Sequence, residues 1–481
     1  MIHRLFLLIL GRALWPLLGV LAGCAVGDAP PKASRTTPEA YRNAPAPAAA
    51  ELPRPSSAWW REFASTELDR LEEAAIANNR DYRIAIARVS QAHAQARLSE
   101  AGLFPTLDAF ARREGFGPEG GPGSVVEGGE WRGANRVRLG VRASYEADVW
   151  GKLGYAADSA LALAAASEHH RESVALTMTS DVAGAYFEYL SYSARAAAGE
   201  RGAQSRRRSL AAMQKRLEGG DATSVETAAL RIALSVAEAT AAGHAQRRER
   251  AFNRLALLAG MAPAELKLAP LALAQIVPPP VNPGLPSELL CRRPDARRAE
   301  AQLLGANFDV RSLRANLLPS FSMVGEMGLG ARHIAALTGP GAMFYLLTAA
   351  LTQTVFDGGR KAAQLEGARA RHLEMLEQYS GTLLTALREV EDALVARRLT
   401  AEQHAARAQA LVAARGQYNM QQRVFDAGGS DQLTLYDAEQ RLVAAEDAAE
   451  EALHDQLRAA IDLYKALGGG SRSDKGDPCQ G

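Results

Sequence analysis

Cysteine, aromatic side chains and net charge are all scarce in this sequence of 481 residues. Its three cysteines, Cys24, Cys291 and Cys479, are too few and too scattered to form a disulfide framework or a zinc site. The 55 basic and 54 acidic side chains nearly cancel, so no overall field favours nucleic acid as a partner. No internal run of about 18 apolar residues occurs, which excludes a polytopic helical membrane protein.

Long tracts of Ala, Glu, Gln, Arg and Leu dominate the chain instead, a composition typical of long helices. Residues 152–218 contain no Pro, and apolar side chains recur there at the three- and four-residue steps of a coiled coil. A helix of that extent is on the order of 100 Å long, too long for a compact domain. A second tract of the same kind leads to residues 422–434.

The N-terminal segment resembles a bacterial lipoprotein signal. Positive charges flank an apolar run, and a small-residue pair then precedes Cys24. We therefore expect residues 1–23 to be removed and Cys24 to carry a diacylglycerol and an N-acyl chain. Residue 25 is Ala, which resembles the sorting pattern for the outer membrane. Residues 24–57, rich in Pro and Ala, are predicted to form a lipidated tether. The alternative is an ordinary secretory signal with an accidental Cys.

The rest of the chain contains two similar halves of about 200 residues each. We place the first structural repeat at 58–260 and the second at 288–467. Between them, the Pro-rich residues 261–287 predict a connector without regular helix. Residues 468–481, rich in Gly, Ser and Asp, are expected to be a disordered tail.

Each repeat contains a helix, a double glycine and a second helix, which predicts an αα-hairpin. The four turn residues are Gly219, Gly220, Gly428 and Gly429. Thr223 and Glu226 have the spacing of a capping box after the first turn, whereas Ser430 or Asp431 caps the helix after the second. Because the returning helices (223–260 and 431–467) are short, we expect further helices, formed from 60–103 and 288–318, to stack above them.

Four segments alternate between apolar and polar residues with the period of a β-strand. The clearest is ~136–148, where Val137, Leu139 and Val141 face one side and Arg138 and Arg142 the other. This pattern is typical of transmembrane barrel strands, which have lipid outside and water inside. The other predicted strands are ~104–114, ~319–329 and ~343–356. In the last of them the alternation is broken by Phe344 and Leu346.

Four strands are too few to close a barrel on their own. An open sheet edge in lipid leaves backbone groups without hydrogen bonds, and bacterial barrels begin at about eight strands. We therefore expect several copies of the chain to share one barrel. The residues alone allow two copies or more.

These features together resemble the TolC/OprM-like outer-membrane efflux factors, in their lipoprotein (NodT-type) branch. The segments that carry the resemblance are YEADVWGK, LPSELLCRRPDARRAEAQL (285–303), NLLPSF, VFDGGRKAA and AGGSDQLTLYDAEQRL. The resemblance covers about 58–467. It implies an α+β membrane protein: a homotrimer whose twelve strands, four per chain, form one outer-membrane β-barrel. A long coiled-coil α-helical barrel would continue it through the periplasm.

The resemblance also implies the partners and the mechanism of the chain. A periplasmic adaptor (membrane fusion) protein and an inner-membrane RND-type pump would drive export of drugs or other toxic compounds. The channel itself would then be passive. We expect it to have no enzyme activity, no metal and no cofactor beyond the lipid. The double-glycine turns would lie at the periplasmic tip, where carboxylates ring a narrow lumen in similar proteins. Asp437 falls on the family's aspartate position, with Asp431 nearby. Helix capping or solvation is the alternative role for either aspartate.

Three positions depart from the family pattern. Related gates carry Tyr and Arg near the second turn, where this chain has Phe425 and Ser430, so hydrophobic closure by Phe425 is an alternative to a hydrogen-bonded lock. Arg423 remains available to pair with an acidic neighbour. Cys291 stands where the family usually has a polar or charged residue, and we assign it no function.

Two other classes remain open at this point. A periplasmic coiled-coil scaffold held only by its lipid would keep the alternating strands out of the membrane. A type I secretion channel would use the same tunnel for polypeptides. The exported substrate is not encoded in the tunnel, because the pump selects it.

Overall fold

The computed structural model describes residues 38–43, 56–116 and 134–470. The predicted signal segment, Cys24, most of the tether and residues 471–481 of the predicted tail lie outside the described residues. Within the described ranges, no helix combines the length and the apolarity needed to cross a membrane.

The two halves repeat the same order of elements. The first contains η2 (Trp59–Phe63), α2 (Thr66–Asn78), α3 (Arg80–Ala101), β1 (Thr106–Phe116), β2 (Ala134–Ala147), α4 (Lys152–Glu218) and α5 (Ser224–Leu258). The second contains α6 (Pro286–Arg292), α7 (Pro294–Ala315), β3 (Ser320–Ala331), η4 (Ile334–Ala336), β4 (Met343–Thr352), α8 (Arg360–Asp426) and α9 (Gln432–Ala466). A short turn, η3 (Leu273–Gln275), lies in the connector between them.

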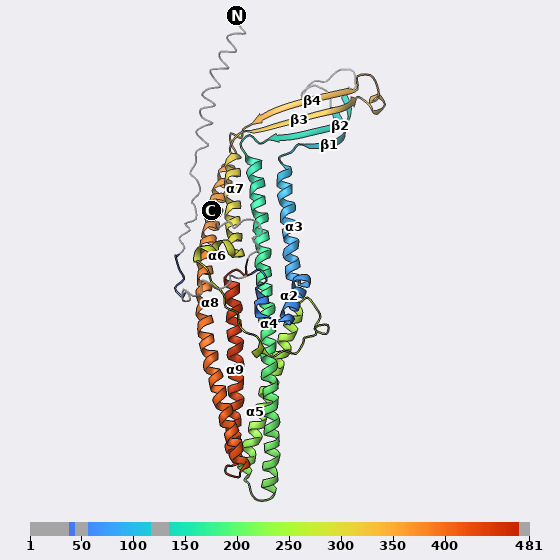
Figure 1. Ribbon diagram of the computed structural model, residues 1–481. Coiled ribbons are helices and arrows are strands. Elements are labelled where there is room, and N and C mark those ends of the chain that lie inside the picture. Colours follow the sequence, from blue (N-terminus) through green and yellow to red (C-terminus); the bar gives the residue numbers. More distant parts are fainter. Residues whose placement is uncertain (1–37, 44–55, 117–133, 471–481) are drawn as a thin grey trace.

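Two long helices, α4 and α8, extend along the whole helical part (Figure 1). Each contains 67 residues, and α5 and α9, with 35 residues each, lie beside their lower parts. Above these short helices, α3 packs on α4, and α7 packs on both long helices. The arrangement of stacked short helices beside continuous long ones agrees with the lengths predicted from the sequence.

The main core lies where the stacked helices meet. Trp59 stacks on Tyr464 with ring centroids 5.4 Å apart, and Phe63 lies 5.2 Å from Phe187. All four aromatic side chains are buried, so η2 anchors the start of the chain to α4 and α9. Leu273 of the connector also enters this core, so the proline-rich segment packs on α4 and α9 at this point.

Some element boundaries differ from the sequence prediction. β1 begins and ends about two residues later than ~104–114, and β4 ends at Thr352 rather than ~356 because the strand-to-helix turn begins there. The predicted helix 288–318 is divided at Arg293, whose extended backbone (φ −72°, ψ 123°) precedes Pro294. A residue before proline is driven out of the helical region by the proline ring.

Candidate functional site

The four strands form one antiparallel sheet in the order β1-β2-β3-β4, at the upper end of the molecule (Figure 1). Their register places predicted lipid-facing residues side by side: Ala109 pairs with Val141, Val141 with Met327, and Met327 with Tyr345. Tyr345 is 86% exposed, so no other described residue covers this apolar face there. An apolar face of this extent across four paired strands is suited to contact with lipid.

The opposite face of the sheet carries charged side chains on its first three strands. Asp108 pairs with Arg142, and Arg142 with Glu326, whose carboxylate lies 3.7 Å from the guanidinium nitrogen Nε. Phe344, which breaks the predicted alternation, lies on this face. Its ring packs over Gly330 and 5.1 Å from the Arg138 guanidinium, so a glycine and a cation–π contact accommodate it.

The strands continue into the long helices through two equivalent joints. Asp148 accepts hydrogen bonds from the backbone N–H groups of Leu153 (3.0 Å) and Gly154 (2.7 Å) at the start of α4. Asp357 does the same for Gly359 (3.0 Å) and Lys361 (3.1 Å) at the start of α8. Each aspartate satisfies helix N–H groups that lack partners within the helix. This contact gives a physical reason for the YEADVWGK and VFDGGRKAA segments.

Arg293, in the RRPD segment, is buried and links helices α8 and α9 by hydrogen bonds. This role was not predicted from the sequence. Its guanidinium donates to Asp295 (2.7 Å), to Glu389 of α8 (2.7 Å) and to the carbonyl oxygen of Ala466 at the end of α9 (2.9 Å). Because Glu389 and Ala466 are distant in sequence, only the pairing of Arg with Asp295 had a local signal.

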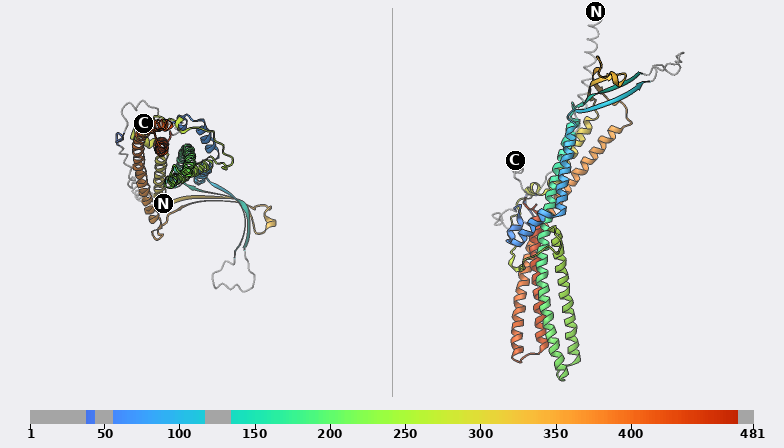
Figure 2. Two further views of the ribbon diagram at one scale, coloured as in Figure 1. Left: turned by 90° about the horizontal axis from the view of Figure 1, so that it is seen from below. Right: turned by 90° about the vertical axis from the view of Figure 1, so that its right-hand side faces the viewer.

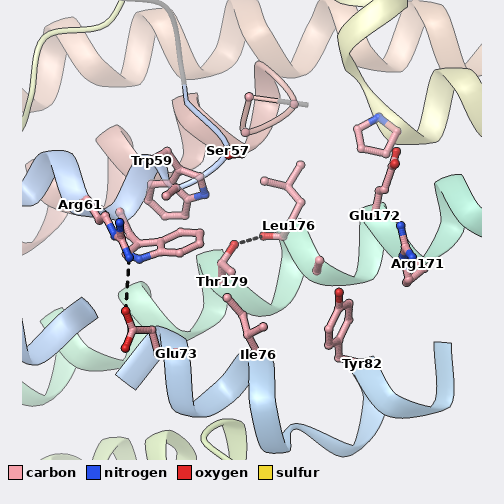
Figure 3. A pocket seen from close by; sticks show the side chains of 17 residues that line it. Ser57, Trp59, Arg61, Glu73, Ile76, Tyr82, Arg171, Glu172, Leu176 and Thr179 are labelled. Atoms are coloured by element: carbon pink, nitrogen blue, oxygen red, sulfur yellow. Dashed lines mark hydrogen bonds and ion pairs between the residues drawn. The ribbon is translucent and has the colours of Figure 1, made fainter. Parts of the chain in front are cut away.

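A cavity of about 700 Å³ lies between η2, α2, the start of α3 and α4 (Figure 3). Its polar groups are engaged nearby: Arg61 contacts Glu73 at 3.3 Å, and Thr179 donates to the carbonyl oxygen of Leu176 in its own helix. Its lining contains neither Cys nor His. These side chains give no nucleophile–base pair.

The structure places both double glycines at the lower end of the molecule, in tight turns (Figure 1). Gly220 (φ +84°) and Gly428 (φ +77°) adopt the left-handed conformation, whereas Gly219 continues the helix. Thr223 forms the predicted capping box with Glu226. Each hairpin therefore ends in a short, well-defined turn.

The proposed gate residues surround the second turn. Asp431 caps α9 by accepting the Thr434 N–H at 2.7 Å, and the hydrogen bonds from Thr434 lower the pKa of this carboxyl. Asp437 and Arg423 are exposed, and Phe425 is half-buried. The structure thus brings these residues to the tip. Of Ser430 and Asp431, the two predicted N-caps, Asp431 is the one that caps α9.

Two polar contacts at the tip were missed from sequence. Gln421 donates to Ser430, one of the residues that depart from the family pattern, and so stabilises the second turn. Gln432 donates to the Ser209 hydroxyl at 3.3 Å and links the second hairpin to α4. Neither pair has a sequence signal, because Gln and Ser are ordinary residues of exposed helices.

Two apolar stripes at the edges of the helical layer are left exposed by the residues that the structure describes. On α5, which packs chiefly on α4, the stripe is Val225, Ala229, Ile232, Val236 and Ala239. These residues recur at the steps of a coiled-coil seam and are all exposed, whereas Leu230 and Ala237 of the same helix are buried. On α8, exposed Val412, Gly416 and Met420 recur at steps of four.

Comparison with known proteins agrees with this architecture. The outer membrane efflux protein family matches residues 71–261 and 285–469. The pyoverdine export outer membrane protein OpmQ of Pseudomonas putida is 34% identical over 467 residues, which cover 96% of this chain and 97% of that protein. The outer membrane protein OprJ of Pseudomonas aeruginosa is 31% identical, with 85% of this chain and 86% of OprJ covered.

A solved structure shows the same fold. The open state of the MtrE outer membrane channel of Neisseria gonorrhoeae has a TM-score of 0.81 and 27% identity, covering 92% of this chain and 98% of MtrE. The fold predicted from the resemblance is confirmed: a trimeric channel in which each chain adds four strands to a barrel and long helices to a tunnel. The chain belongs to the outer membrane efflux protein family, and it is the outer-membrane channel of an efflux system.

Proposed function

We propose that three copies of this chain form a passive, gated duct for small organic molecules, including drugs and other toxic compounds. The duct has no catalytic activity of its own, and a periplasmic adaptor with an RND-type inner-membrane pump supplies the energy and selects the cargo. Relatives named for pyoverdine export and for solvent and toluene efflux support small organic cargo. Cys24, carrying lipid, anchors the N-terminus in the outer membrane.

The observation that carries this proposal is the apolar face of the sheet. It is continuous across four strands, and two of these strands lead through capped joints into 67-residue helices. The edge strands, β1 and β4, each have a backbone edge that another copy can pair. Closure around an axis thus produces a barrel in lipid and a helical tunnel below it.

The proposed gate lies at the tip, where Asp431 and Asp437 of each chain ring the lumen. Six carboxylates in a narrow passage attract cations electrostatically. Phe425 closes the passage by hydrophobic contact, and Arg423 pairs with an acidic neighbour of another hairpin. The adaptor opens this tip when the pump engages.

Planar-bilayer conductance tests the duct and its gate together. The wild-type trimer should conduct with a preference for cations, and the double variant Asp431→Asn/Asp437→Asn should lose that preference. Asn is used at 431 because it caps a helix as well as Asp does, so the turn stays intact. Equal selectivity in the two proteins contradicts the carboxylate ring, and a protein that never conducts contradicts the duct.

The cargo is tested in cells. Deletion of the chain should raise sensitivity to small toxic compounds, and expression should restore resistance only together with the cognate adaptor and pump. Loss of a secreted polypeptide, with unchanged drug sensitivity, would indicate the secretion channel instead.

A further inference from the structure

The two hairpins of the chain, α4–α5 and α8–α9, lie side by side in the lower half of the molecule (Figure 2). They meet chiefly where α9 packs on α4. Below the main core this contact includes polar pairs: the Arg206 guanidinium lies 5.7 Å from the centre of the Tyr436 ring, and Gln432 donates to Ser209. A polar contact between helices is easier to separate than an apolar one, because water replaces its hydrogen bonds.

The strongest link in this contact involves three helices. Arg195 of α4 donates from Nε and Nη2 to the two carboxylate oxygens of Asp447 in α9, at 2.6 and 2.8 Å. His244 of α5 places its Nε2 atom 3.2 Å from the same carboxylate. The side chains of Arg195 and His244 are only 8% and 10% exposed. We call Arg195, His244 and Asp447 the three-helix joint.

The surroundings of His244 favour its neutral form. The Nδ1 atom is buried and has no hydrogen-bond partner among the described residues, so a proton added there would lack an acceptor. Burial lowers the pKa of the imidazole; Asp447 and Glu451 of α9 oppose this effect, whereas Arg195 and Arg247 add to it. The Tyr192 ring of α4 stacks on the imidazole, with the ring centroids 6.1 Å apart.

Asp447 stays ionised where His244 titrates. Burial alone would raise the pKa of this carboxyl, but the hydrogen bond and charge of Arg195 lower it overall. Glu450, one helix position away from Glu451, is a second nearby titrating group, because burial raises its pKa. Its contribution must be separated from that of His244 by experiment.

We propose that the three-helix joint is an acid-sensitive fastening between the two hairpins, which loosens when the pH of the periplasm falls. A histidine with a lowered pKa in the joined state binds protons more tightly when the hairpins separate. The joint is therefore fully stable above the ordinary pKa of histidine and loses stability as the pH falls through it toward the lowered value. Acid favours separation of α9 from α4 and α5.

The position of the joint determines its effect on the duct. Arg195 lies 23 residues before Glu218, the end of α4, which places it about 35 Å above the tip. Release there frees the lower part of the α8–α9 hairpin, which carries the proposed gate. This inference rests on the proposed duct, and it adds a control by pH that is independent of the adaptor.

Hydrogen–deuterium exchange of the purified trimer, corrected for intrinsic exchange rates, tests the joint directly at pH 7.5 and 5.5. Exchange in α9 around Asp447 should rise on acidification in the wild type and stay constant in His244→Gln, whose amide still donates to Asp447. The rise is at most about tenfold for each pH unit between the two pKa values of His244. Asp447→Asn should show fast exchange at both pH values.

Two matched variants complete the test. Glu450→Gln and His372→Gln should both keep the wild-type response to pH. His372 is a suitable control because it is a buried histidine of α8, and burial lowers its pKa as well. Open probability in bilayers should follow the exchange data. Equal exchange of α9 at the two pH values in the wild type, or a response that survives in His244→Gln, overturns the joint, whereas absence of conductance at any pH contradicts only the duct.

Discussion

At the scale of single residues, the sheet depends on a close approach between two glycines. Gly140 and Gly328 pair across β2 and β3. A Cβ atom at Gly328 would lie 2.2 Å from the carbonyl oxygen of Leu139, and one at Gly140 would lie 2.4 Å from that of Met327. These contacts are with backbone, which has no side-chain freedom to relax.

Gly328→Ala should therefore prevent correct pairing of β2 with β3 and reduce the yield of trimer. The measurement is heat-modifiable migration of the outer-membrane fraction on a gel, where a folded trimer migrates differently before and after boiling. Gly325→Ala is the matched control on the same strand, because its Cβ atom would meet only the Leu347 side chain at 3.8 Å. Equal trimer yields from the two variants would refute the close approach.

At the scale of elements, the sequence predicted the helices better than their contacts. The ends of α4 agree with the predicted 152–218, because this tract lacks Pro and ends at a double glycine. The tie from Arg293 to Glu389 was out of reach, since it joins residues far apart in the chain. The side to which the α5 stripe faces was also out of reach, because no described residue covers it.

The first turn of α5 is stabilised by its capping box, so Thr223→Ala should make it fray. Amide exchange in the first turn of α5 should rise roughly fivefold, the effect of losing one N-cap. Thr240→Ala serves as the control, since that hydroxyl only donates to the Val236 carbonyl within the helix. Unchanged exchange in Thr223→Ala would mean that the turn is held by contacts other than the cap.

At the scale of the whole molecule, the apolar stripes of α5 and α8 are expected to meet between neighbouring copies. The contact of Gln432 with Ser209, nine residues before the end of α4, places the second turn above the first. Ala239 lies fifteen residues after Ser224, the start of α5, and Met420 lies six before Asp426, the end of α8. Because the second turn lies nine residues higher than the first, Ala239 and Met420 both lie the length of fifteen helical residues above the first turn. The two residues are therefore at the same height.

The double variant Ala239→Cys/Met420→Cys should consequently form disulfides between chains, visible as dimers and trimers on a non-reducing gel. Ala229→Cys/Met420→Cys is the control, because Ala229 belongs to the same stripe but lies about 15 Å lower. Stronger cross-linking in the control would place the neighbouring copies at another height. Cross-links within single chains would show that the stripes do not form the contact between copies.

The equal helix lengths in the two halves limit how this protein tolerates insertions and deletions. Loss of seven residues from α4 alone would raise one hairpin tip by about 10 Å and leave α5 without its matching partner. Shortening is compatible with a sealed tube only when whole heptads are removed from both arms of both hairpins. A bacterium with a narrower periplasm would then need four coordinated deletions of equal size.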